Sequence, residues 1–299
     1  MKRHARKLAG LLGACLLAGS AHAKLNVFAC EPEWAALTQA LAGEHAKVFS
    51  ATHAGQDPHY VQARPSLIAK LRSADLAVCT GAELETGWMP MLQRRARNPK
   101  VLPGKPGYFE ATRQVSLLEK PAKLDRAEGD VHGDGNPHIQ VDPRRILEVA
   151  QALSARLQQI DPGNRATYQG LLQDFMSHWE ASMQRWETEV AGLKGKRVVV
   201  HHRAWIYLLD WLGMQRVGSL EPKPGIPPNM AHLADLTEQQ ADLIVISPAN
   251  DTKPSAWLQQ QTGTSVAVLP HTLGAVPNSD DLFAFFDEII RRLSEAVKT

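Results

Sequence analysis

The sequence predicts an α/β fold in which two Rossmann-like lobes are joined by a single long helix. Short apolar runs alternate with longer amphipathic ones from Lys24 to Arg95, and the alternation restarts at Arg197. This pattern is typical of parallel βαβ units. Between these regions, apolar residues recur at three- and four-residue steps from Tyr168 to Val190. That spacing predicts a helix of about 28 residues, on the order of 40 Å long, which is enough to bridge two lobes.

We expect residues 24–160 to form the first lobe, residues 161–194 the bridging helix and residues 195–299 the second lobe. The apolar runs of the first lobe predict strands at 26–30, 47–50 and 75–79, and helices at 34–41, 66–71 and 84–95. Those of the second lobe predict strands at 197–200, 242–246 and 265–269, and helices at 204–212 and 282–297.

Two Asp-Pro pairs mark helix starts, because Asp caps a helix and Pro fits its first position. Asp142-Pro143 opens the last helix of the first lobe, and Asp161-Pro162 opens the bridging helix. Residues 119–137 break the strand–helix pattern and are rich in Gly, Asp, His and Asn. This composition predicts a loop.

Residues 1–23 have the pattern of a secretory signal peptide, with a basic start, an apolar run and an Ala-x-Ala cleavage motif ending at Ala23. The apolar run is shorter than the ~20 residues of a membrane-spanning helix. Leu12-Gly13-Ala14-Cys15 resembles a lipoprotein box, and lipid anchoring at Cys15 is the weaker alternative. We therefore expect a periplasmic protein.

The net charge limits the kinds of partner that the protein is expected to bind. The net charge is +2 and no run of Lys or Arg follows the leader, so nothing indicates binding to nucleic acid or to an anionic membrane surface.

Cys30 and Cys79 remain after the leader, and each closes an apolar run. They form either a disulfide between neighbouring strands or two buried thiols, and the sequence favours neither.

Three histidines stand where a strand end or loop precedes a helix: His59, His138 and His202. Neutral imidazole is the commonest protein ligand for zinc. Their wide separation indicates one site assembled by the tertiary fold, in the cleft between the lobes, with two ligands from the first lobe and one from the second. His201 points away from this site on strand alternation. Six other histidines lack a ligand context: His4, His22, His45, His53, His178 and His232.

Four groups of motifs surround these histidines. They are Asp57-Pro58-His59-Tyr60 with Arg64-Pro65-Ser66, Thr80-Gly81-Ala82-Glu83-Leu84-Glu85 with Trp88, Asn136-Pro137-His138 with Asp142-Pro143, and His202-Arg203-Ala204-Trp205-Ile206-Tyr207. In these motifs the chain resembles the zinc/manganese periplasmic substrate-binding proteins of metal ABC importers, solute-binding protein family 9. The resemblance implies two α/β lobes bridged by a long helix, with His59, His138 and His202 as metal ligands. It also implies a monomer that binds Zn²⁺ as its transported ligand, delivers it to an inner-membrane ABC permease and performs no catalysis.

The sequence departs from this family at the fourth ligand, which is usually acidic. Ser247 stands at one expected acidic position, and the late strand runs into Pro270-His271 without a carboxylate. His271 is the candidate fourth ligand, and a water molecule is the alternative. Relatives selecting manganese use two carboxylates, so their loss favours zinc over manganese or iron.

The loop before His138 contains Asp130, His132 and Asp134. These side chains either collect metal weakly or belong to a solvated Gly/Asp loop, which is the favoured interpretation.

Two other classes of protein remain as alternatives. Three histidines with an open fourth position also serve catalytic zinc, so a zinc-dependent hydrolase is the first, with Glu83, Glu85 or Glu221 as its general base. The chain lacks the His-Glu-x-x-His, Gly-x-Ser-x-Gly, phosphate-loop and dinucleotide motifs. A metal-independent adhesin or scaffold is the second.

Overall fold

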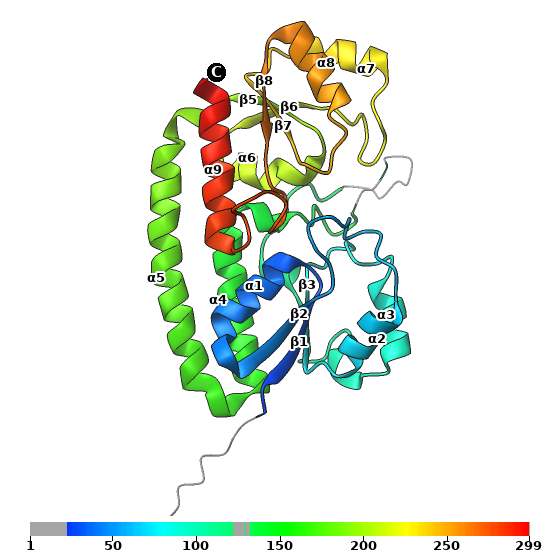
Figure 1. Ribbon diagram of the computed structural model, residues 1–299, viewed down its shortest axis with the longest axis vertical. Coiled ribbons are helices and arrows are strands. Elements are labelled where there is room, and N and C mark those ends of the chain that lie inside the picture. Colours follow the sequence, from blue (N-terminus) through cyan, green and yellow to red (C-terminus); the bar gives the residue numbers. More distant parts are fainter. Residues whose placement is uncertain (1–22, 122–128, 130–131, 299) are drawn as a thin grey trace, which may run out of the picture.

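The computed structural model describes residues 23–121, 129 and 132–298. The expected signal peptide therefore lies outside the described residues, apart from Ala23. Two four-stranded sheets form the centres of two lobes, in the orders β2-β1-β3-β4 and β6-β5-β7-β8 (Figure 1). Every pairing within both sheets is parallel. The predicted α/β class with two lobes is confirmed.

The first sheet and its helices alternate along the chain as the apolar runs predicted, and β4 is an additional strand that was not predicted. The elements of this part are β1 (Leu25–Ala29), α1 (Pro32–Ala42), β2 (Ala46–Ser50), α2 (Pro65–Arg72), β3 (Leu76–Cys79), α3 (Met89–Ala96), β4 (Tyr108–Glu110) and α4 (Pro143–Ile160).

The second sheet repeats this alternation. The remaining elements are α5 (Arg165–Glu189), β5 (Arg197–Val200), α6 (Ile206–Leu212), β6 (Gln215–Ser219), α7 (Met230–Thr237), β7 (Leu243–Ile246), α8 (Lys253–Thr262), β8 (Ser265–Val268) and α9 (Leu282–Lys298).

The long helix α5 runs beside both lobes (Figure 1). Trp179 of α5 donates its indole N–H to the carbonyl of Pro143 in α4, at 2.8 Å. Trp179 and Trp186 also pack against Phe286 of α9, with ring centroids 5.5 and 5.1 Å apart. These rings are buried, and their large apolar area makes them strong packing groups. The helix therefore joins the two lobes through a continuous apolar core.

Three helices begin later than the sequence predicts. The helix expected from Ala204 begins at Ile206, because Arg203–Trp205 form a 3-10 turn. The bridging helix spans 25 residues from Arg165, because Pro162–Asn164 form a separate 3-10 turn. The helix expected from Leu84 begins at Met89. Residues 82–88 instead form turns, in which the backbone N–H of Thr86 donates to the carbonyl of Glu83 at 3.3 Å and that of Trp88 to the carbonyl of Glu85 at 3.1 Å.

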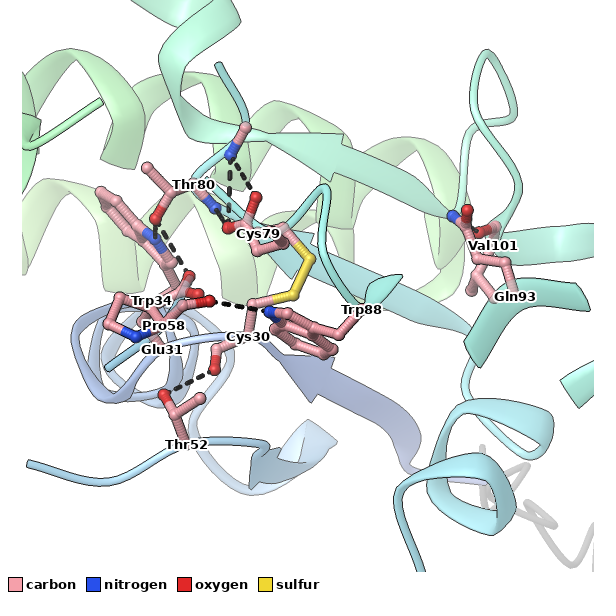
Figure 2. Close-up of a disulfide and its surroundings, with 12 residues drawn as sticks. Cys30, Glu31, Trp34, Thr52, Pro58, Cys79, Thr80, Trp88, Gln93 and Val101 are labelled. Carbon is pink, nitrogen blue, oxygen red and sulfur yellow. Dashed lines mark hydrogen bonds between the residues drawn. A yellow bond between two sulfur atoms is a disulfide. The ribbon is translucent and has the colours of Figure 1, made fainter. Parts of the chain in front are cut away.

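Cys30 and Cys79 form a disulfide, with Cα atoms 4.8 Å apart (Figure 2). Each cysteine directly follows or closes one of the paired strands β1 and β3. Both are fully buried. They lie within 4.8 Å of a Glu85 carboxylate oxygen, but sulfur atoms joined to each other are not thiolate ligands for a metal.

Among the described residues, none of the helices combines the length and apolar character needed to cross a membrane.

Candidate metal centre

His59 lies in the loop that follows β2. Its ring Nδ1 is 2.8 Å from Oδ1 of Asp57, which also accepts the backbone N–H of His59 at 2.9 Å. The indole of Trp88 donates to the carbonyl of Pro58 at 2.8 Å (Figure 2). The hydrogen bond to His59 lowers the pKa of Asp57 against the opposing effect of burial. The carboxylate therefore holds the proton on Nδ1 and leaves Nε2 as the ring's lone-pair nitrogen.

His138 precedes a short 3-10 turn, Ile139–Val141. Its Nδ1 is 2.9 Å from Oδ1 of Asn136, which also accepts the His138 backbone N–H at 3.0 Å. The Asn136 side-chain nitrogen donates to the carbonyl of Arg203 at 2.9 Å. A carbonyl can only accept, so this bond fixes which end of the amide faces His138. His138 consequently also carries its proton on Nδ1, and Asn136 links it to the second lobe.

His202 lies two residues after Val200, the last residue of β5. Its Nδ1 is 2.7 Å from Oε2 of Glu221, which also accepts the backbone N–H of Gly225 at 3.0 Å. The bond to His202 lowers the pKa of Glu221, although burial acts in the opposite direction. Glu221 was a candidate general base in the sequence, and the structure places it as the acceptor that orients His202.

The structure brings these three histidine rings together from three separate segments. The ring centroid of His138 is 6.1 Å from that of His59 and 5.4 Å from that of His202. Burial, together with the neighbouring His202 and His59, holds the pKa of His138 well below its ordinary value. A metal-binding imidazole must be neutral, so this environment suits a cation ligand.

A fourth ring, that of His132, joins the group. Its Nε2 lies 3.3 Å from Nε2 of His59, and its centroid is 5.3 Å from that of His59 and 6.5 Å from that of His138. The sequence favoured a solvated loop here, because Gly and Asp surround this histidine. Asp134 is exposed, and Asp130 lies outside the described residues.

His271 lies near the group and is partly buried. Burial lowers its pKa, and so does the nearby His202, while Asp57 raises it. Its Nδ1 is buried, and no hydrogen-bond partner for it is found in the described part of the chain. The backbone carbonyl of His271 accepts from the Gln140 side chain at 3.1 Å.

His201 is separate from the ring group. It is buried, and its Nε2 lies 3.9 Å from Oε1 of Glu221, the oxygen that His202 does not use.

Known proteins resemble this chain over most of its length. Zinc-binding lipoprotein AdcA of Streptococcus pneumoniae serotype 4 is 27% identical over 246 residues, which cover 80% of this chain and 48% of AdcA. The chain thus spans about half the length of that relative. High-affinity zinc uptake system protein ZnuA of Yersinia pestis is 24% identical over 268 residues, covering 82% of each chain. Manganese ABC transporter substrate-binding lipoprotein PsaA of Streptococcus mitis is 22% identical, covering 81% of this chain and 78% of PsaA.

Solved structures share the fold. A crystal structure of ZnuA superimposes with a TM-score of 0.74 at 19% identity, covering 91% of this chain and 99% of that one. The Mn-bound periplasmic metal binding protein of Candidatus Liberibacter asiaticus gives 0.76 at 18% identity, covering 92% and 100%. Residues 27–296 match the family described as zinc-uptake complex component A, periplasmic. The chain belongs to this family.

Proposed function

We propose that this chain captures Zn²⁺ through His59, His138 and His202 and delivers it to an ABC permease in the inner membrane. The observation that carries the proposal is the common state of the three rings. Each Nδ1 is bonded to an acceptor oxygen, on Asp57, Asn136 or Glu221. Such acceptors fix the tautomer and orientation of histidines that bind a metal through the other nitrogen.

Zinc is the cargo that this donor set favours. Imidazole suits zinc, whereas carboxylates suit manganese. The positions where the family usually supplies carboxylates hold Ser247 and His271. His271 is the fourth ligand that the sequence predicts, and its buried Nδ1 has no hydrogen-bond partner among the described residues. Relatives named for manganese occur among the similar proteins, so manganese or iron is the alternative cargo.

Catalysis is not the function of this family, which consists of substrate-binding transport components. Each of the three glutamates considered as the general base of a hydrolase accepts a hydrogen bond from another group. Glu221 orients His202, Glu85 accepts the backbone N–H groups of Thr80 and Gly81, and Glu83 accepts that of Gly133.

Isothermal titration of demetallated protein tests the proposal. We expect about one zinc per chain and much weaker manganese binding. Stronger binding of manganese than of zinc would reverse the cargo assignment, and binding of neither metal would refute the function.

We further propose that the protein is an exported, monomeric periplasmic component, cleaved after Ala23 rather than lipidated at Cys15. The signal-peptide pattern of the first 23 residues supports export. The mass of the mature amino terminus distinguishes the two forms, because a lipidated chain would begin at Cys15 and carry acyl groups.

A further inference from the structure

The Nε2 atoms of His59 and His132 are 3.3 Å apart. In a tetrahedral zinc site with Zn–N distances near 2.0–2.1 Å, two ligand nitrogens are about 3.3–3.4 Å apart. In the structure this separation corresponds to a hydrogen bond between the two rings, and it also equals the separation of two ligands of one ion. We propose that His132 is the fourth zinc ligand and that Glu83 is the residue that positions it. This inference rests on the proposed function.

A backbone hydrogen bond beside His132 ties its segment to the first lobe. The backbone N–H of Gly133 donates to Oε2 of Glu83 at 2.7 Å. Hydrogen bonds between a charged acceptor and an N–H are stronger than neutral ones. Since Gly133 is the residue next to His132, this bond sets the position of the backbone from which the imidazole extends.

Glu83 is itself held in an unusual backbone conformation. Gly81, Ala82 and Glu83 are three successive left-handed residues, with φ angles of 83°, 48° and 68°. Such conformations persist in non-glycine residues where the surroundings impose them. The buried carboxylate of Glu85 imposes this turn, because it accepts the backbone N–H groups of Thr80 at 2.7 Å and Gly81 at 3.0 Å. Glu83 extends from this turn, and its carboxylate accepts the Gly133 N–H.

The same segment also meets the second lobe. Gly129 has a φ of +83°, and a Cβ atom there would lie 2.3 Å from the carbonyl oxygen of Pro224. A side chain at this position is therefore excluded by contact as well as by conformation. Gly135 has a φ of +122°, and its Cβ would lie 2.8 Å from Cβ of Leu117. The glycines of this loop permit close contacts on both sides of His132, which a merely solvated loop would not require.

His271 is the competing fourth ligand. Its buried Nδ1, which has no hydrogen-bond partner among the described residues, supports that role. His132, however, packs its ring against two of the three predicted ligands, and its Nε2 has a ligand-like separation from His59. The geometry of the described residues therefore favours His132.

Zinc titration of single variants of the full mature chain separates the two candidates. We expect His132→Ala to weaken zinc binding by at least about tenfold, because it removes a ligand and not merely an outer contact. His271→Ala should change the affinity by less than about twofold, as should His178→Ala, which alters an exposed histidine of α5. An affinity for His132→Ala equal to that of His178→Ala would overturn the proposal.

The visible absorption of Co²⁺-loaded protein reports coordination directly. A four-coordinate cobalt site absorbs more intensely than sites of higher coordination, so His132→Ala should change the band intensity and shape while His271→Ala should not. The reverse result would overturn the proposal. If the wild-type protein does not bind zinc, or if His59→Ala binds zinc as tightly as the wild type, the proposed function is refuted instead.

The positioning role of Glu83 has its own pair of variants. Glu83→Ala removes the acceptor of the Gly133 N–H and should weaken zinc binding by about two- to tenfold, the value of one hydrogen bond. Glu83→Gln keeps an acceptor oxygen and should restore most of the affinity and the cobalt spectrum. Equal affinities for wild type and Glu83→Ala would overturn this role.

Discussion

The Nδ1 atom of His202 lies 2.7 Å from Oε2 of Glu221, and both residues follow neighbouring strands of the second sheet, β5 and β6. The acceptors of His59 and His138 are only two residues from their histidines, whereas Glu221 is 19 residues from His202. The orientation of His202 therefore depends on the register of two strands. A substitution at Glu221 tests whether that orientation matters for binding.

We expect Glu221→Ala to weaken zinc binding by about 10–100-fold, the usual effect of removing an acceptor behind a metal-binding histidine. Glu221→Gln retains an oxygen acceptor and should lose less zinc affinity than Glu221→Ala. Isothermal titration of each variant measures the difference.

Glu238 provides the matched control, because it is an exposed glutamate of the same lobe at the end of α7. Glu238→Ala should bind zinc as the wild type does. If Glu221→Ala and Glu238→Ala bind equally well, Glu221 does not orient a ligand.

Zinc should stabilise the folded chain. A ligand that binds only the native state contributes about 4 kcal/mol at a thousandfold excess over its Kd, which corresponds to a rise of several degrees in Tm for a protein of this size. His59→Ala, His138→Ala and His202→Ala should each largely abolish the shift. Calorimetry with and without zinc measures it.

His178 on the exposed face of α5 serves as the control for this series, and His178→Ala should retain the full shift. If a histidine variant shows the same zinc-induced rise in Tm as His178→Ala, that histidine is not a zinc ligand.

Much of the fold follows from local signals. The Asp142-Pro143 pair predicted a helix start, and the Asp142 side chain indeed accepts the backbone N–H of Arg144 at 2.9 Å. The same signal at Asp161-Pro162 preceded a 3-10 turn instead, so it placed the bridging helix a few residues early. Helix starts depend on weak local preferences that neighbouring packing overrides.

The site was less predictable than the fold. Asp57 and Asn136 lie beside their histidines in sequence, so those pairs could be found as local motifs. The contacts of His132 with His59 and of Glu83 with Gly133 join residues 73 and 50 positions apart. No local pattern encodes such contacts, and the Gly-rich composition around His132 indicated only a loop. Similarly, the cysteines at the ends of β1 and β3 left a disulfide and two thiols equally open.

Removal of the disulfide should destabilise the chain. Cys30 and Cys79 are 49 residues apart, and closing a loop of this size lowers the entropy of the unfolded state by an amount equivalent to about 4 kcal/mol. We expect a loss of this order in the free energy of unfolding of a Cys30→Ala, Cys79→Ala double variant. Urea denaturation in the presence of a chelator measures it.

The control is urea denaturation of the wild-type chain under reducing conditions. This chain loses the same cross-link without deletion of the two sulfur atoms, so it should show a similar decrease in stability. Unchanged stability in both samples would mean that the disulfide does not constrain the unfolded chain.

Glu33 links the lobes from a buried position in α1. Its Oε2 accepts the hydroxyl of Thr272 at 2.8 Å, and burial raises its pKa to about 7. The folded state thus holds a proton on Glu33 between about pH 4.5, the ordinary pKa of the group, and pH 7. The native state binds more protons than the unfolded state in this range. The free energy of unfolding therefore decreases as the pH rises from about 4.5 to 7.

Glu33→Gln should remove that dependence, because the amide is neutral at every pH and still offers an oxygen to Thr272. The variant should gain stability relative to wild type as the pH rises from 4.5 to 7, by an amount on the order of 3 kcal/mol, and the difference should then stay constant. Urea denaturation of the metal-free proteins at a series of pH values measures it. Glu44→Gln, at an exposed glutamate shortly after α1, should run parallel to wild type throughout. A constant difference between wild type and Glu33→Gln across this range would show that Glu33 is already ionised in the folded chain, and that its link to Thr272 is a bond to a carboxylate instead of a carboxylic acid.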